Sequence, residues 1–484
     1  MTNRGHSAHS IAAIFPEHRC REGRGKASIS RSLVQVLMKQ PVECPQRLFL
    51  FVLSFAGFAS LLPQGAMAQQ LVQQYFPSDV PGYAPDFSSS VVNRLVTQNQ
   101  SQGINVGSFV VRPSATQAFG YNSSTLGLPG TGSSSESTSA GIGVKSNWSR
   151  NSLGASVSVA DQRYLDIPIA SFTNWNAAIG GAVALGRDSV SLGYSHLALH
   201  LSATDLGVFG VTTPAPYDVN DVRLSYNKTF ARFSLTPAFE FEDFSFGTSS
   251  GQANINYASL SHQLEVGSLQ TRYQLSTGNA LVAILRGSTA QFSRLPGTRP
   301  NNYDDVAAFF GLDFRGDSLV QYRVLVGGEH RSFSSAGFVS ASTPTAEVDA
   351  VWTPSRLDTV TASLFRRLDD PESPFARNQT ITFGTLQYDH ELRQNLYFRV
   401  TGSLGATDSQ SNTVGQENNS QTQYKAGASG TWLVNRHVSA TLGYSFNHSH
   451  SSSNVSPLEN VTAFGTTLNS FTSHTVSISV SIFE

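Results

Sequence analysis

The last stretch of the chain, Thr475-Val476-Ser477-Ile478-Ser479-Val480-Ser481-Ile482-Phe483, decides the fold. Apolar residues occupy every second position and serine occupies the positions between them, which is the period of a β-strand with two different faces. The same alternation returns in residues 233–242, 396–404 and 438–447. No window of the chain has a comparable helical period. The sequence therefore predicts an all-β protein in which each strand has one apolar and one polar face.

The length of these segments favours strands that cross a membrane. They run for about 10–15 residues, whereas strands of soluble proteins average about 5–6 residues and tilted transmembrane strands need about 10. A soluble sandwich has to bury the apolar faces against partner sheets, but a closed barrel buries them in lipid and has no open edge. We therefore expect an antiparallel transmembrane outer-membrane β-barrel. The alternative is a secreted soluble β-solenoid, whose repeats are shorter, at about 20–30 residues.

The connections between strands give the strand number. Short polar turns alternate with longer loops rich in Gly, Ser, Asn and Pro, as in outer-membrane barrels. An arginine marks most short turns, and we expect it to be a polar turn residue that snorkels toward the headgroups. The marked turns carry Arg150, Arg187, Arg232, Arg315, Arg356, Arg393 and Arg436.

The interval between Arg232 and Arg315 is about twice the others, so we expect one hidden turn, at Ser276-Thr277-Gly278-Asn279. Eight short turns and nine long loops then predict about 18 strands, with 16 or 20 as alternatives, and place both termini in the periplasm. This count requires residues 252–276 to form one long strand.

The composition excludes several other classes of protein. Only 13% of the 484 residues are charged and 39% are hydrophobic, against about 25% charged residues in an average chain. A helical membrane protein needs longer apolar spans, and 32 basic against 33 acidic residues leave no excess for binding nucleic acid. Two cysteines do not make a disulfide scaffold. Strands with one lipid face and one water face explain low charge without high hydrophobicity.

The start of the chain has the pattern of a secretory signal. The apolar run LFLFVLSFAGFASLL (48–62) follows Met38-Lys39 and precedes Ala66-Met67-Ala68. A charged start, an apolar middle and small residues at the end indicate a signal peptide at 38–68, with cleavage near Ala68/Gln69. Residues 1–37 are then an upstream mis-start or an unusual extension.

The rest of the chain divides into two predicted parts. Residues 69–105 are rich in Gln and Pro and have no clear period, so we expect a periplasmic tail that contacts export machinery or enters the lumen. Residues 106–484 form the predicted barrel. All three methionines and both cysteines lie before residue 69, so the predicted mature chain has no thiol for a disulfide or a thiolate metal site.

Two segments carry a resemblance to a known family. These are Gly103-Ile104-Asn105-Val106-Gly107-Ser108-Phe109-Val110-Val111-Arg112-Pro113 and residues 364–397, which contain Phe365-Arg366-Arg367 and Tyr388-Asp389-His390-Glu391-Leu392. The chain resembles the β-barrel porin type 2 family, outer-membrane β-barrel proteins associated with exopolysaccharide loci. The resemblance implies a role in polysaccharide export or surface attachment in the outer membrane of a Gram-negative bacterium.

A barrel of about 18 strands is wide enough for a water-filled lumen. Arginines facing it would attract an acidic polymer, whereas acidic and aromatic residues suit neutral sugars or cations. Both kinds are present, and a third reading is a lumen tied by Arg–carboxylate pairs with no single ligand. The lumen-lining candidates are Arg223, Glu240, Glu242, Arg272, Asp313, Arg323, Glu347, Asp349, Tyr397 and Arg399, with Gln270, Gln274, Gln321 and Thr401 on the same faces.

The sequence gives little sign of metal or catalytic chemistry. His448 and His450 share one face of a strand, as two metal ligands would, but no third ligand accompanies them, and a solvated loop is the simpler interpretation. The histidines are scattered and no G-x-S-x-G nucleophile motif is present. The acidic pairs Asp304-Asp305 and Asp369-Asp370 are expected to solvate loops. We therefore expect no enzyme activity and no cofactor.

Three functions remain in order of preference. The first is a porin-like outer-membrane barrel that exports exopolysaccharide or attaches it to the surface. The second is a diffusion porin for small solutes, and the third is a barrel hydrolase. The expected partners are outer-membrane lipid, the barrel-assembly machinery, the polysaccharide and a periplasmic export complex, and nucleic acid is not expected.

Overall fold

The computed structural model describes residues 80–81, 103–128, 130–208, 213–247, 257–293, 300–315, 319–411, 418–452 and 470–484. The chain divides into the units Met1–Phe51 and Val52–Glu484, and every described residue belongs to the second. The predicted extension at 1–37 and the predicted signal peptide at 38–68 lie outside the described residues. Of the predicted tail at 69–105, only residues 80–81 and 103–105 are described.

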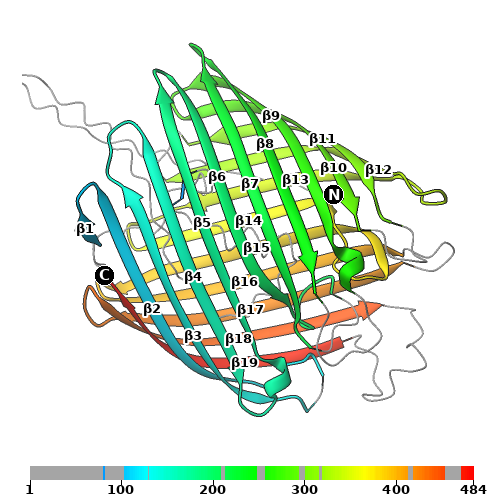
Figure 1. Ribbon diagram of the computed structural model, residues 1–484. Coiled ribbons are helices and arrows are strands. Elements are labelled where there is room, and N and C mark those ends of the chain that lie inside the picture. The colour runs from blue at the N-terminus through cyan, green and yellow to red at the C-terminus, as the bar shows by residue number, and fades with distance from the viewer. Residues whose placement is uncertain are drawn as a thin grey trace, which may run out of the picture. The chain divides into compact units, whose positions relative to one another are not determined.

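Eighteen long strands, β2 to β19, pair antiparallel in sequence order, and β19 pairs with β2, so the sheet closes into a barrel (Figure 1). This confirms the predicted fold class and strand number. The short strand β1 forms a hairpin with the start of β2, where Val106 pairs with Phe109. The end of β19 pairs further along β2, where Phe483 lies opposite Ser114. The two strands therefore share one edge of β2.

The strands are long throughout, as the alternation predicts. Their bounds, with those of the two short 3-10 helices η1 and η2, are β1 Ile104–Val106, β2 Phe109–Asn122, β3 Ser133–Ser146, β4 Ser152–Tyr164, η1 Pro168–Ala170, β5 Phe172–Leu185, β6 Asp188–Leu201, β7 Ala215–Thr229, β8 Phe233–Phe246, η2 Tyr257–Leu260, β9 His262–Ser276, β10 Asn279–Phe292, β11 Tyr303–Phe314, β12 Val320–Phe333, β13 Ala341–Trp352, β14 Asp358–Asp369, β15 Ala376–Arg393, β16 Leu396–Ser411, β17 Asn419–Leu433, β18 Val438–Ser452 and β19 Ser470–Phe483.

The hidden turn lies where the arginine spacing predicts it, since Thr277 and Gly278 alone separate β9 from β10. Gly278 has φ of +81°, a backbone conformation that a tight hairpin requires and that side chains other than glycine disfavour. The expected single strand at 252–276 is wrong in its first part. Residues 257–260 form η2, because Tyr257 and Leu260 turn inward and pack against buried side chains of β6, β7 and β8.

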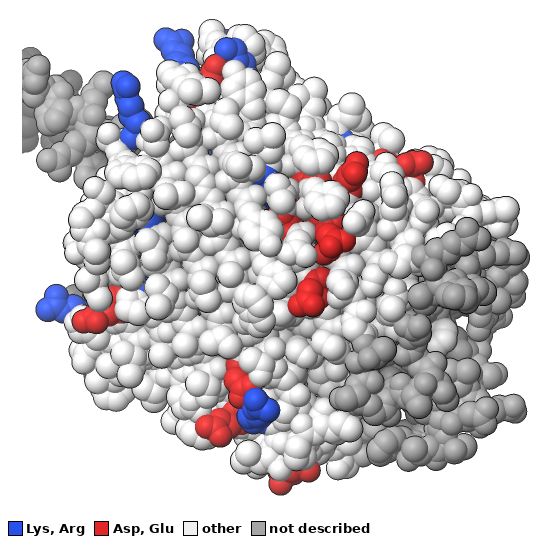
Figure 2. All heavy atoms as spheres, in the orientation of Figure 1, with Lys and Arg blue, Asp and Glu red and all other residues white. Residues whose placement is uncertain are grey.

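Because the sheet is closed, alternate residues of each strand face outward or into the lumen. The large apolar side chains that are exposed lie on the outward register, among them Phe239, Leu285, Val326, Ile478 and Ile482. Lys, Arg, Asp and Glu are sparse on the face shown in Figure 2. Outward aromatic residues such as Trp352 and Trp432 lie beside the short turns, as in the interfacial girdles of membrane barrels. The outer wall is thus suited to lipid.

The barrel has two different ends. One carries the short turns, and the other carries the long connections between β2 and β3 and onward round the barrel. With an even number of strands, β2 begins and β19 ends at the short-turn end. Among the described residues, no helix is long and apolar enough to span a membrane.

Candidate functional site

The connection between β6 and β7 crosses the inside of the barrel. Its described first part, residues 202–208, is here called the cross-lumen loop. Leu206 is fully buried against Ile381 and Phe383 of β15, with Phe365 of β14 beside them. Since β15 is nine strands away from β6 in the closed sheet of eighteen, the loop reaches the opposite wall. It therefore narrows the lumen.

Backbone contacts fix the tip of this loop to the same wall. The Gly207 N–H donates to Gln421 Oε1 on β17 at 2.6 Å, and Gln423 Nε2 donates to the Thr204 carbonyl at 3.0 Å. Gly207 has φ of +86°, and a Cβ atom there would lie 2.9 Å from Gln379 Oε1. Glycine is favoured here because other residues rarely adopt this backbone conformation. The loop is thus seated by shape and by hydrogen bonds.

A hydrophobic cluster lies on the side where the loop originates. Leu197, Leu199 and Leu201 of β6, all fully buried, pack with Tyr217 of β7 and Phe244 of β8 and with η2. These residues occupy the inward register at the long-loop end of their strands. Apolar residues on an inward face are stable only if something covers them, and here they cover one another and η2. The long-loop end of the lumen is therefore filled beside β6 to β8.

Below this cluster, toward the short turns, the wall becomes charged. Arg223 of β7 forms ion pairs with Asp221 at 3.0 Å, with Glu240, and with Glu242 at 3.8 Å. Each of these residues lies on the inward register of β7 or β8. Within the described residues, Asp221, Glu240 and Glu242 are the one group of three side chains placed to share a metal ion, with ligand atoms within 4.8 Å of one another. The guanidinium already neutralises part of their charge.

A second and more buried cluster centres on Arg331 of β12, whose side chain is 4% exposed. Its guanidinium pairs with Asp305 at 3.0 Å and with Asp370 at 3.2 Å, and donates to Asn378 Oδ1 at 2.9 Å. It also lies over the Tyr303 ring, 3.7 Å from the centroid. Several partners satisfy the buried charge at once, which is the condition under which burial of an arginine is tolerated.

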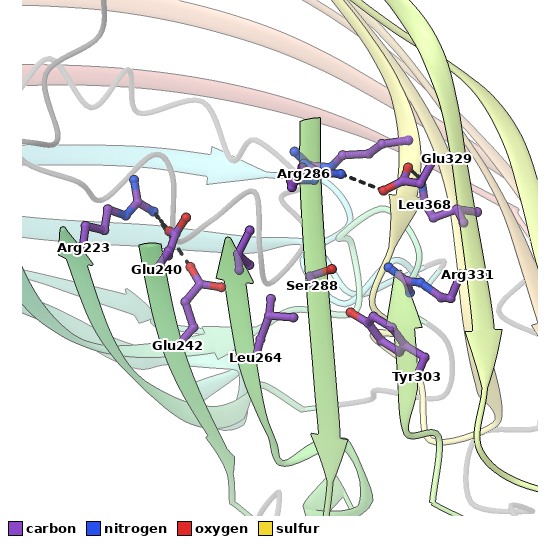
Figure 3. Close-up of a pocket in the computed structure, with 12 residues that line it drawn as sticks. Arg223, Glu240, Glu242, Leu264, Arg286, Ser288, Tyr303, Glu329, Arg331 and Leu368 are labelled. Atoms are coloured by element: carbon purple, nitrogen blue, oxygen red, sulfur yellow. Dashed lines mark hydrogen bonds and ion pairs between the residues drawn. The ribbon is translucent and has the colours of Figure 1, made fainter. Parts of the chain in front are cut away.

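The two clusters border one cavity of about 120 Å³. Figure 3 shows Arg223, Glu240 and Glu242 on one side of it and Glu329 and Arg331 on the other, with Arg286 between them. Arg286 pairs with Glu329 at 2.6 Å. The cavity walls are thus mainly ion pairs, with apolar contributions that include Leu264.

Asp370 lies in the loop after β14 and contacts side chains of this wall near the long-loop end of the barrel. It accepts a hydrogen bond from the Tyr303 hydroxyl at 2.5 Å, and its Oδ2 lies 3.2 Å from His262 Nε2. Burial alone raises the pKa of this carboxyl, but contact with His262 and the charge of Arg331 hold the pKa well below its ordinary range. The carboxylate form is therefore strongly stabilised at this position.

These contacts correct the expectation for the acidic pairs. Asp304 and Asp305 belong to β11 and Asp369 ends β14, so three of the four lie in strands and not in loops. Asp305, Asp369 and Asp370 are buried, and each has an arginine partner. They form ion pairs along the inner wall instead of solvating loops. Their arginine partners also lie on inward registers, and the sequence alone does not reveal that these side chains meet.

The wall from β17 through β19 to β4 has a different chemistry. Its inward register is rich in hydroxyl and amide groups, which form hydrogen bonds across strands. Thr116 donates to Ser481 at 2.9 Å, and Gln421 donates to Ser449 at 2.9 Å. The inward serines of this wall are Ser429, Ser439, Ser445, Ser449, Ser451, Ser473, Ser477, Ser479, Ser481, Ser114, Ser133, Ser135, Ser137, Ser139, Ser152, Ser156 and Ser158.

The structure places the ten lumen-lining candidates on inward registers, opposite the exposed apolar side chains, but not at one site. Arg223, Glu240 and Glu242 border the cavity. The others lie nearer the short turns in local pairs. Arg272 contacts Asp313 at 2.8 Å, Arg323 contacts Gln270 at 3.3 Å and Arg399 contacts Asp389 at 2.6 Å. Glu347 and Asp349 lie on β13 near Arg323, and Tyr397 is buried at the start of β16.

Sequence reasoning missed five other residues that border the same cavity, namely Arg286, Tyr303, Glu329, Arg331 and Arg367. Two of these residues could have been predicted from the sequence. Gln321, Arg323, Glu329 and Arg331 are all on odd positions of one strand, so the register that marks Arg323 also marks the other two charges. What the register does not reveal is that these side chains converge.

His448 and His450 lie on the outward register of β18, on the same side as the exposed Leu442 and Tyr444. Their Nδ1 atoms contact Thr472 and Ser470 of β19, both at 2.9 Å. Residues 453–469 beyond them are not among the described residues. Both therefore belong to a strand and not to the solvated loop that we expected, and within the described residues they are not part of a group of three potential metal ligands.

Part of the N-terminal tail lies in the lumen. Val80 is fully buried against Ala178, on the inward register of β5. A Cβ atom at Gly180 would lie 2.6 Å from the Pro81 carbonyl and 2.7 Å from Val80 Cγ1. Glycine at 180 thus leaves the space that these two residues fill.

Several solved structures have a similar fold. OccK2 (OpdF) of Pseudomonas aeruginosa is 13% identical with a TM-score of 0.42, covering 79% of this chain and 99% of that one. OccAB2 of Acinetobacter baumannii is 10% identical with a TM-score of 0.41 over 79% and 100% of the two chains. The siderophore receptor PirA of Pseudomonas aeruginosa is 12% identical with a TM-score of 0.36 over 79% and 81%. No curated protein matches the sequence.

A family model covers most of the barrel. The family described as Putative beta-barrel porin 2 matches residues 99–468, a span that begins just before β1 and ends just before β19. This agrees with the closed barrel, its apolar outer wall and its polar lumen. The chain therefore belongs to this porin-like family of outer-membrane β-barrels.

Proposed function

We propose that this protein is an outer-membrane channel for hydroxyl-rich carbohydrate, and that exopolysaccharide is the polymer it exports or holds at the surface. The observation that carries the proposal is the inner wall from β17 through β19 to β4, whose inward register is lined by serine. Neutral hydroxyl and amide groups exchange hydrogen bonds with sugar hydroxyls at little cost in desolvation. A wall of fixed charges lacks this tolerance.

The location and partners belong to the same proposal. The signal peptide at 38–68 directs export with cleavage near Ala68, the assembly machinery inserts the barrel, and the termini face the periplasm. The position of Val80 and Pro81 inside the lumen supports a tail that meets an export complex at the periplasmic mouth.

The test combines genetics with single-channel recording. Deletion of the gene is expected to abolish or strongly reduce secreted polymer while the polymer-synthesis enzymes remain active. In planar bilayers, oligosaccharides of that polymer are expected to interrupt the current of the purified barrel, as a bound chain excludes ions. Unchanged secretion together with a current insensitive to the oligosaccharides would contradict the proposal.

A second candidate, a selective porin for small solutes, is favoured by the cross-lumen loop. A loop seated on the opposite wall through Leu206 and Gly207 reduces the cross-section available to a polymer. This candidate predicts an open, steady conductance and uptake of small solutes in liposome swelling, with polymer secretion unaffected by the deletion. The same pair of measurements therefore separates the two functions.

A further inference from the structure

The barrel wall has a seam between β13 and β14. The two strands pair from Ala346 opposite Arg366 to Trp352 opposite Val360. Toward the long-loop end, β13 continues for the residues 341–345 and β14 for 367–369, and the described residues form no ladder between them there. Pro344 lies on this unpaired part of β13, where a residue without an N–H is tolerated.

Side chains of β12 replace the missing backbone pairing. The Leu368 N–H of β14 donates to Glu329 Oε2 at 2.7 Å, and Arg331 Nη1 donates to the Asp369 carbonyl at 3.1 Å. Both side chains belong to the lumen-facing register of β12. These two backbone groups are thus hydrogen-bonded to side chains, which can change conformation. In a β-ladder they would be bonded to the backbone of the next strand.

A depression of about 410 Å³ lies on the outer side of the wall over β11, β12 and β13, next to the unpaired part of β13. Outward residues of β11, β12 and β13, including Val306, Ala308 and Pro344, line it. Thr343 and Glu329 also line it, although both belong to inward registers. Glu329 borders the charged lumen cavity as well. Glu329 is thus the residue that borders both the outer depression and the polar cavity inside the barrel.

We propose that this seam is a lateral portal that binds an amphiphile with one apolar chain and an anionic headgroup. The chain would lie in the depression against Val306, Ala308 and Pro344, in the region that faces lipid. The headgroup would replace the Glu329 carboxylate and take its donors, which are the Arg286 guanidinium and the Leu368 N–H. These donors fit a carboxylate or phosphate oxygen and do not fit a cation.

The experiment uses the full barrel in phospholipid nanodiscs and a long-chain fatty acid with a photoreactive diazirine in its chain. After illumination, mass spectrometry locates the labelled residues. Label is expected to concentrate at the depression, at Val306 and Pro344, and Glu329→Gln is expected to raise it about tenfold, because the amide competes less well for Arg286. Label spread evenly round the outer wall, or unchanged in Glu329→Gln, would overturn the proposal.

A disulfide tests the seam itself. Continuing the register places Pro344 opposite Leu368, so oxidised Pro344→Cys/Leu368→Cys closes the portal and is expected to lose the label, and reduction is expected to restore it. The matched control is Val348→Cys/Leu364→Cys, a pair inside the existing ladder, which should label like the parent. Equal labelling of both oxidised variants would contradict the proposed portal. If the first disulfide does not form, the Glu329→Gln comparison decides alone.

The headgroup has its own control. A fatty alcohol of the same chain length and with the same photoreactive group should label the depression far less than the fatty acid, since it lacks the charge that pairs with Arg286. Equal labelling by the two probes would show that the depression binds apolar chains without a headgroup site, and that outcome contradicts the proposal.

Discussion

The two halves of the lumen wall are held together by different interactions. The wall from β7 to β14 is cross-linked by buried ion pairs centred on Arg223, Arg286 and Arg331. The wall from β17 through β19 to β4 is held by serine, threonine and amide groups, such as Thr116 with Ser481. Buried charges are strong when paired and costly when one partner is lost, whereas exchangeable hydroxyl groups tolerate loss.

This difference assigns separate roles to the two walls. A wall of mutually satisfied charges is rigid, and a ligand reaches a cation such as Arg286 only by displacing the carboxylate that it pairs with. A wall of small hydroxyl side chains leaves space and offers hydrogen bonds that water or sugar can share. The charged wall therefore supports the barrel, and under the proposed function the hydroxyl wall is the surface along which a solute moves. Each prediction below tests one side of this contrast.

The largest effect is expected for Arg331→Met. Removal of the guanidinium leaves Asp305 and Asp370 without their buried cation, which costs about 3–5 kcal/mol of unfolding free energy. Heat-modifiable migration in detergent measures the unfolding midpoint. The control is Arg163→Met, whose ion pair with Asp161 is exposed on the outer register and should change the midpoint little. If both variants unfold alike, the charged wall is not a structural support.

Leu206→Ala tests how the cross-lumen loop is held. Leu206 is fully buried against Ile381 and Phe383, and truncation of such a leucine costs about 2–5 kcal/mol. We expect the loop to leave the wall and the single-channel conductance to rise. Leu165→Ala, in the exposed connection after β4, is the control and should leave conductance unchanged. A conductance that does not respond to Leu206→Ala would mean that the loop does not limit the pore.

Features that depend on neighbouring residues were predictable from the sequence, whereas features that depend on contacts between distant segments were not. The turn at Thr277 and Gly278 was predictable because hairpin turns depend on local residues. The helix η2 was not, because Tyr257 and Leu260 turn inward only through contacts with buried side chains of β6 to β8, which are distant in the sequence. The contact of Leu206 with Ile381 joins distant segments of the chain, and no periodicity encodes it.

The charges show the same limit in another form. Strand alternation puts Arg223, Glu240 and Glu242 on inward faces, and the structure brings these three together. The burial of Asp370 depends on Arg331 and His262 from other strands. An acidic pair in a predicted loop is therefore read as solvated until the neighbouring strands are known.

A smaller and pH-dependent effect is expected for Asp370→Asn. Contacts with His262, Arg331 and Tyr303 hold the pKa of Asp370 below its ordinary value. The ionised carboxylate therefore stabilises the fold above the ordinary aspartate pKa of about 4, and the stabilisation is lost as pH falls through the lowered pKa. We expect Asp370→Asn to lower stability by about 1.5–3 kcal/mol near neutral pH.

The measurement is the unfolding midpoint from pH 7 down to pH 2 for the parent and Asp370→Asn. The difference between them should be constant down to about pH 4 and shrink below it. Asp304→Asn, on the outward and exposed register of β11, is the control without this signature. A difference that grows as the solution becomes acidic would contradict the sign of the pKa shift.

The smallest effect on stability, and the most informative one on function, is expected for the triple variant Ser477→Ala, Ser479→Ala and Ser481→Ala. These inward serines belong to the stretch that fixes the strand period. Loss of three hydroxyl groups should change the unfolding midpoint little, since small polar groups in a wet lumen exchange their hydrogen bonds with water.

Transport should respond differently from stability. If sugar hydroxyls bind along this wall, the residence time of an oligosaccharide in the channel should fall about tenfold, because each lost hydrogen bond contributes about 0.5 kcal/mol or more. The same three positions changed to threonine keep the hydroxyls and should retain most of the binding. Equal residence times in the alanine variant and the parent would leave the hydroxyl wall as a passive lining. The narrowing by the cross-lumen loop would then favour the small-solute channel over the polysaccharide channel.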